Sequence, residues 1–258
     1  MKLNITSRLS YVLERPTDLL LQVELARIAG QTVLSDALST TPVRDFARIP
    51  AEGALGTRAW MEAEGQLDVT YEAQVEVTRP DIDLTALGTT SVRYLGAEAT
   101  SYLMPSRYVP SDEFEALVTD EYSGLSGGAL IVAVSDWIRE SFVYDGEAST
   151  NTTTARDSYF ARRGVCRDYA HVLIAFARAS GIPARIASVY APDVDPPDFH
   201  AVAEVWLEGA WHLVDATGMA KPSQMAVIGA GRDAAEVSFL SSFGFAEFLH
   251  QSVDVSRA

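Results

Sequence analysis

Cys166 is the only cysteine among 258 residues, and it lies where a helix is expected to begin. Gly164 allows a tight turn into this helix, and the free N–H groups of a first helical turn favour a thiolate. His200 and Asp215 follow at the expected ends of later strands. A thiol, an imidazole and a carboxylate on three elements can form a cysteine nucleophile site. The alternative is that Cys166 is a small buried apolar side chain.

Each of the three residue types has its own role in such a site. A neighbouring imidazolium favours the reactive thiolate, so His200 would hold Cys166 in an ion pair and then protonate a leaving amine. Asp215 would accept a hydrogen bond from the other ring nitrogen and fix the orientation of the imidazole. The main-chain N–H of Cys166, at the helix start, would hold the oxyanion of the reaction intermediate.

Spacing alone does not bring His200 and Asp215 into contact. The turn Glu208-Gly209-Ala210 predicts a hairpin, and a hairpin centred on Gly209 places Asp215 opposite position 203. Asp215 would then lie three residues, about 10 Å along the ladder, from the level of His200. Direct contact would need a bulge or strand twist, so counting leaves this pair open.

The other histidines have simpler interpretations. His171 is five residues after Cys166, about 140° around a helix, so we expect a structural role. His212 alternates away from Asp215 along its strand, and His250 has no evident partner. No pair of histidines has zinc-ligand spacing and no acidic loop has calcium-site spacing, so we expect no metal and no cofactor. Asp168, in the first turn of the cysteine helix, would favour the helix dipole or pair with Arg185.

Composition limits the partners. Thirty-five acidic and twenty basic residues give a net charge of −15, and the absence of a basic patch argues against nucleic acid or an anionic membrane. One cysteine excludes an intrachain disulfide. The N-terminal residues lack the apolar segment of a signal peptide, so a cytoplasmic location is the default expectation. Oligomerisation is possible, but nothing in the sequence tests it.

The chain divides into a β-rich region over residues 1–105 and a mixed region over 106–258. Alternating apolar residues from Leu67 to Val77 predict a half-buried antiparallel strand, and several such strands predict a sandwich-like domain. Further strands are expected over 3–13 and 19–28. In the second region we expect helices from Ser111, over 129–142, over 158–163 and over 166–180, strands over 184–191, 201–207 and 211–215, and a C-terminal strand over 251–255.

These motifs resemble those of the bacterial transglutaminase-like superfamily. The nucleophile motif is Gly164-Val165-Cys166-Arg167-Asp168-Tyr169-Ala170-His171, and the next is Gly181-Ile182-Pro183-Ala184-Arg185. The segments beginning at His200 and Trp211 resemble the histidine and aspartate strands of that family. The resemblance implies a papain-like α+β core, in which a cysteine-bearing helix packs on an antiparallel sheet, and a Cys–His–Asp triad formed by Cys166, His200 and Asp215.

The resemblance also implies an activity and leaves its details open. Animal-type members have an oxyanion-stabilising Trp before the cysteine; this chain has none between Tyr144 and Asp157, so Asn151 is a candidate donor. Val165 and Arg167 are further oxyanion or cleft candidates, and Gly164, Asp168 and Arg185 support the motif. We expect a cysteine protease or amidase acting on a peptide or protein amide. Amine transfer in the manner of transglutaminases, a non-catalytic binding module and an assembly scaffold are the alternatives.

Overall fold

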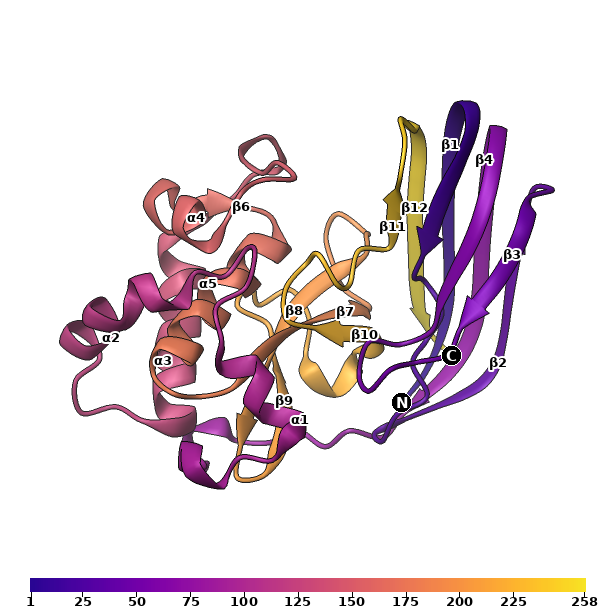
Figure 1. The fold of residues 1–258 in the computed structure, drawn as a ribbon. Coiled ribbons are helices and arrows are strands. Elements are labelled where there is room, and N and C mark those ends of the chain that lie inside the picture. The colour runs from indigo at the N-terminus through magenta and orange to yellow at the C-terminus, as the bar shows by residue number, and fades with distance from the viewer.

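Regular alternation of buried side chains builds one large antiparallel sheet in the first part of the chain (Figure 1). The computed structural model describes all 258 residues. The two long central strands are β1 (Lys2–Leu21) and β4 (Arg58–Val77), which pair along most of their length. Every second side chain of each strand is buried on one face, as a strand with one wet face requires.

Shorter strands complete this sheet on both sides. β2 (Gln31–Thr40) and β3 (Arg44–Ile49) pair with β4, whereas β11 (Leu240–Ser242) and β12 (Glu247–Arg257) pair with β1. The C-terminal strand tail therefore belongs to the sheet of the β-rich region, not to the mixed region to which the sequence analysis assigned it. Pairing with β1 buries Val253 against the apolar face of this sheet. Sequence alternation reveals a strand but not its partner.

A second sheet carries the helices. Its strands are β7 (Ala184–Tyr190), β8 (His200–Leu207), β9 (Ala210–Val214) and β10 (Ala226–Gly231), in the order β10-β7-β8-β9 and all antiparallel. Helix α5 (Cys166–Ala179) packs on β7 and β8. Around it lie α2 (Glu115–Glu121), α3 (Gly127–Ser141) and α4 (Ala155–Ala161), whereas α1 (Ala97–Thr100) does not pack on it. The short strands β5 (Val143–Tyr144) and β6 (Arg163–Gly164) pair in parallel beside α5.

The two sheets share a hydrophobic core. Tyr190, Phe199, Ala226 and Ile228 from the second sheet and its loops pack into the apolar face formed by β1 and β4. The fold is α+β, with a cysteine-bearing helix on an antiparallel sheet, as predicted. The partner layer of the β-rich region, however, is the second sheet itself. The large sheet consequently forms one wall of any cavity that opens between the two layers.

Several predicted boundaries differ from the structure. Pro16 does not break the first strand, because β1 accommodates it with a shift of register between Leu13 and Thr17. β1 ends at Leu21, and the predicted strand over 19–28 does not form beyond that point. The helix expected from Ser111 begins as a single 3-10 turn before α2. No helix is long and apolar enough to cross a membrane.

Candidate active site

Cys166 is the first residue of α5, and three neighbours define its position. Gly164 has φ +155°, and a Cβ at this position would lie 2.5 Å from an oxygen of Asp168, so a side chain is excluded. The fully buried carboxylate of Asp168 accepts the N–H of Val165 at 2.8 Å. This bond fixes the entry into the helix, and the N–H of Val165 is no longer free to bind an oxyanion. Cys166 itself is half-buried.

His200 and Asp215 meet through a hairpin that differs from the counted one by a single residue. The turn contains only Glu208 and Gly209, both with positive φ, so Leu207 pairs with Ala210 and Ala203 pairs with Val214. If this register continues by one residue, Asp215 lies opposite Val202. Val202 is two residues from His200, so Asp215 and His200 share one face of the sheet. A one-residue change of register moves a side chain to the other face. The expected separation was therefore wrong.

Asp215 accepts four hydrogen bonds from three residues. His200 Nε2 donates to Oδ2 at 2.9 Å, and the N–H of Ala220 donates to the same oxygen at 3.0 Å. The N–H and the hydroxyl of Thr217 donate to Oδ1 at 2.9 and 2.6 Å. Burial acts to raise the pKa of Asp215, but these bonds and the charge of His200 outweigh burial and lower it below its usual value. Asp215 is a carboxylate that holds one imidazole orientation.

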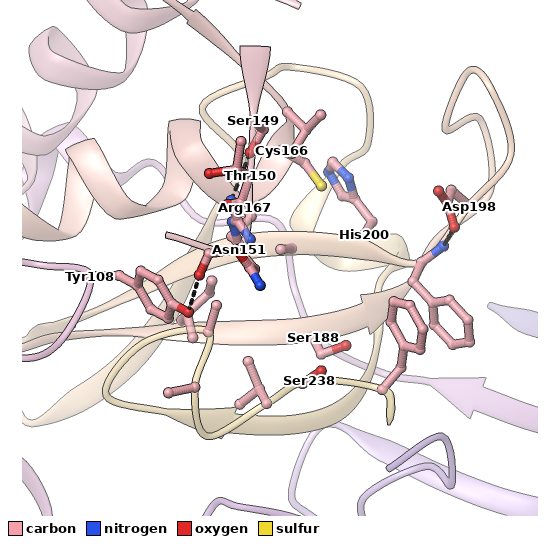
Figure 2. A pocket seen from close by; sticks show the side chains of 18 of the residues that line it. Tyr108, Ser149, Thr150, Asn151, Cys166, Arg167, Ser188, Asp198, His200 and Ser238 are labelled. Carbon is pink, nitrogen blue, oxygen red and sulfur yellow. Dashed lines mark hydrogen bonds between the residues drawn. The ribbon is translucent and has the colours of Figure 1, made fainter. Parts of the chain in front are cut away.

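The imidazole of His200 lies between Asp215 and the thiol. Its Nδ1 is buried and has no nitrogen or oxygen partner, and the sulfur of Cys166 points toward the ring (Figure 2). Burial acts to lower the pKa of His200, but the bond to Asp215 and the adjacent Cys166 raise it to about 10. The ring is consequently an imidazolium at neutral pH. The structure thus brings Cys166, His200 and Asp215 together in the order that a thiolate–imidazolium–carboxylate chain requires.

Tyr144, which the sequence analysis did not select, also contacts the thiol. β5 pairs Tyr144 with Gly164, which places its side chain beside Cys166. Burial and, after it, the charge of Cys166 raise the pKa of Tyr144, whose hydroxyl lies beside the main chain and the side chain of Cys166. β5 has two residues, too few for any periodicity to indicate which way a side chain faces. No signal in the single sequence distinguishes this tyrosine from the nine others.

The thiol faces a cavity of about 640 Å³ between the two sheets. The second sheet contributes His200 and Ser188, and the large sheet contributes Ser241 and Gln251. Asp198, also missed from the sequence, lies at the rim and accepts a hydrogen bond from the side-chain amide of Gln251. The cavity is open beside Cys166, so the β-rich region lines the site without filling it.

Some of the remaining candidate site residues line the cavity, and Arg185 does not. Asn151, Val165 and Arg167 line the cavity, and Asn151 is bonded through its main-chain oxygen to the hydroxyl of Tyr108 at 2.7 Å (Figure 2). Arg185 lies outside the cavity and pairs with Glu204 at 2.7 Å, with its guanidinium 3.9 Å from the ring of Trp211. The suggested pairing of Arg185 with Asp168 is therefore wrong, because these residues have Glu204 and Arg167, respectively, as charged partners.

His171 is buried on α5 away from the thiol. Its Nε2 accepts the N–H of Ala234 at 3.2 Å, and its ring stacks on Tyr108. Burial lowers the pKa of His171 to about 3, so it is neutral. Ala234 lies in a segment that lines the cavity. His171 therefore supports a cavity wall.

Comparison with known proteins agrees with this geometry. Residues 117–216 match the transglutaminase-like superfamily, and this range includes Cys166, His200 and Asp215. A crystal structure of a Cytophaga hutchinsonii protein, named a "putative cysteine protease", superposes with a TM-score of 0.91 and 30% identity over 99% of this chain and 90% of that chain. The chain belongs to the transglutaminase-like superfamily, and its fold is that of the papain-like thiol enzymes.

Two mycobacterial relatives are similar in sequence. An uncharacterized protein of Mycobacterium leprae is 25% identical over 221 residues, which are 81% of this chain and 79% of the relative. An uncharacterized protein of Mycobacterium tuberculosis is 31% identical over 134 residues, which are 46% of this chain and 43% of the relative. This chain therefore spans less than half of the second relative, and neither relative's name assigns an activity.

Proposed function

We propose that this protein is a cysteine peptidase or amidase that cleaves a peptide or side-chain amide through a thioester on Cys166. The observation that carries the proposal is the continuous chain from the sulfur of Cys166 through His200 to Asp215, located at an open cavity. The pKa of His200 is raised to about 10, and an imidazolium beside a thiol favours the nucleophilic thiolate form.

The first half of the reaction forms the thioester. The thiolate of Cys166 attacks the amide carbon, and the carbonyl oxygen becomes an oxyanion. We expect the main-chain N–H of Cys166 and the hydroxyl of Tyr144 to donate to that oxygen when the substrate replaces the contact between them. His200 transfers its Nδ1 proton to the amide nitrogen, the C–N bond breaks, and the amine leaves. Asp215 keeps Nε2 bonded throughout, so Nδ1 is the nitrogen that exchanges the proton.

The second half releases the acyl group. Neutral His200 accepts a proton from water through Nδ1, the hydroxide formed attacks the thioester carbon, and the carboxylic acid leaves as the thiolate and imidazolium are restored. An amine in place of water gives a new amide by the same steps, which is transglutaminase-type transfer. Hydrolysis is the primary proposal, because water needs no second binding site.

A non-catalytic binding module is the alternative of a different class. That alternative would be favoured by a thiol too far from the imidazole to bond, or by a cleft filled by the β-rich region. In support of catalysis, the sulfur points toward His200 and the cavity beside it is open. The raised pKa of His200 further favours chemistry over binding alone.

Labelling of Cys166 tests the proposal, because every thiol label on this chain belongs to one residue. Iodoacetamide near neutral pH should modify the wild-type protein faster than free cysteine, and Cys166→Ala should fold normally and take no label. A peptide library incubated with a labelled amine, with ammonia and cleavage products monitored, then separates hydrolysis from transfer. The proposal fails if wild-type Cys166 reacts no faster than free cysteine, or if Cys166→Ala retains turnover.

A further inference from the structure

The charged side chains of the cavity differ in sign from those of the protein as a whole. The chain carries thirty-five acidic and twenty basic residues, yet the residues that line the cavity include two arginines, Arg107 and Arg167, and one acid, Asp198. The two arginines lie over the same tyrosine: their guanidinium carbons are 5.0 and 5.8 Å from the ring centre of Tyr108. Two like charges are thus gathered at one part of the wall.

Neither arginine is fully paired within the protein. Arg107 is exposed and has no ion pair or hydrogen bond to another residue. Arg167 donates through Nη2 to Ser149 Oγ at 2.6 Å, to the carbonyl of Thr150 at 2.7 Å and to Asp168 at 3.3 Å. Its Nε is buried without a partner. The bonds through Nη2 hold the guanidinium in place and leave donor capacity on the same group.

The positive and negative side chains lie at different parts of the cavity. Arg167 follows Cys166 in α5, whereas Asp198 is placed beyond His200 as seen from the thiol (Figure 2). His200 protonates the leaving amine, so the amine departs on the side of Asp198. An anionic group of the substrate is repelled there and attracted at the arginines. The acyl portion of the substrate is the portion that can carry it.

We propose that Arg107 and Arg167 form a subsite for a carboxylate on the acyl side of the substrate. This inference rests on the proposed function, because it assigns the substrate class of the same thiol. The carboxylate has two possible sources: an acidic side chain near the cleaved amide, or a terminal carboxylate of a short acyl chain. Arginine pairs suit either source, since a guanidinium binds a carboxylate through two parallel hydrogen bonds.

Chloromethyl ketones matched in size and different in charge test the subsite. The first pair is acetyl-Glu-Ala and acetyl-Gln-Ala chloromethyl ketone, and the second is succinyl-Ala and succinamoyl-Ala chloromethyl ketone. We expect the anionic member of at least one pair to alkylate Cys166 faster, by about two- to fivefold for each arginine engaged. The preference should decrease at high salt, because surface charges are screened. Which pair shows the preference identifies the source of the carboxylate.

Arginine variants assign the preference to its residues. Arg107→Gln should lower the rate of the anionic reagent and leave the neutral one unchanged, whereas Arg107→Lys should keep most of the preference. Arg93→Gln is the matched control, since Arg93 lies 4.9 Å from the ring of Tyr94 in a similar contact outside the cavity. Equal rates within both pairs, or a preference that survives Arg107→Gln combined with Arg167→Gln, overturns the subsite and leaves the nucleophile intact. No labelling by any reagent overturns both.

Discussion

The two halves of the candidate active site are built in contrasting ways. His200 and Asp215 lie on the second sheet and at the end of its hairpin, both less than a tenth exposed, and Asp215 has four hydrogen bonds that fix it. Cys166 and Tyr144 lie on a helix start and a two-residue strand beside the open cavity, and Tyr144 is 40% exposed. In the proposed reaction, His200 and Asp215 fix the position of the transferred proton, and Cys166 and Tyr144 contact the substrate.

The difference between the two halves indicates where a substitution affects stability as well as activity. In the buried half, the four hydrogen bonds of Asp215 lie inside the protein, so a single change there disturbs both geometry and stability. In the open half, a lost side chain is replaced by water, and the fold is little affected. Variants should therefore separate into those that change activity and stability together and those that change activity alone.

Asp215→Asn should give the largest effect on the buried half. The amide cannot accept from His200, from Thr217 and from Ala220 as a carboxylate does, and the imidazolium loses its counter-charge. We expect kcat to fall by about 10⁴-fold, together with a lower melting temperature. Turnover of the best library peptide and thermal unfolding measure the two effects. Unchanged turnover would remove Asp215 from the catalytic chain.

Tyr144→Phe should act on activity alone. Loss of one oxyanion donor lowers kcat by about 10²-fold when the donor is fully engaged. The melting temperature should stay within a degree or so of wild type, because the phenol is at the cavity surface. Tyr94→Phe, on a tyrosine that is 71% exposed, is the matched control. An equal loss of activity and stability in Tyr144→Phe would show that the two halves are not separate.

Alkaline pH should disrupt the ion pair between the halves. His200 has a raised pKa of about 10, so the imidazolium is present at neutral pH and is lost as the pH rises through that value. Turnover should fall about tenfold per pH unit above it. The stabilisation from this raised pKa is complete below the unfolded value of about 6.5, declines as the pH rises from there, and is lost as the pH passes the folded value of about 10. Imidazole NMR resonances of wild type and Cys166→Ala report the titration. A midpoint near the unfolded value in wild type would contradict the ion pair.

The sequence indicated the parts of the site better than their contacts. The cysteine helix, the strands of His200 and Asp215 and the order of the three residues were predicted from apolar periodicity, turn residues and family resemblance. The contact between His200 and Asp215 was implied by the resemblance but not by counting along the hairpin, because one residue in the turn decides which face Asp215 shares. Counting could not distinguish a two-residue turn at Glu208-Gly209 from a three-residue one.

Long-range strand pairing explains why the other contacts were not predicted from the sequence. Tyr144 reaches Cys166 only because β5 pairs with β6, and Gln251 reaches the cavity only because β12 pairs with β1. Each strand was too short, or too distant in sequence from its partner, for a local pattern to specify the pairing. Similarly, Arg185 had several possible acidic partners, and only the register of β7 against β8 selects Glu204.

Thr217→Val tests the buried half with the smallest change. Its hydroxyl is one of two groups of Thr217 that donate to Asp215 Oδ1, so the carboxylate keeps the main-chain bond, His200 and Ala220. We expect kcat to fall by about fivefold, the effect of one hydrogen bond of about 1 kcal/mol. The pKa of Asp215 should rise toward its usual value, so the acid limit of activity moves to higher pH. Thr119→Val, whose hydroxyl bonds Glu115 on the exposed surface of α2, should change neither property. A Thr217→Val profile that overlays wild type would mean that Asp215 is held by the main chain alone, and that the buried half has more tolerance than its hydrogen bonds indicate.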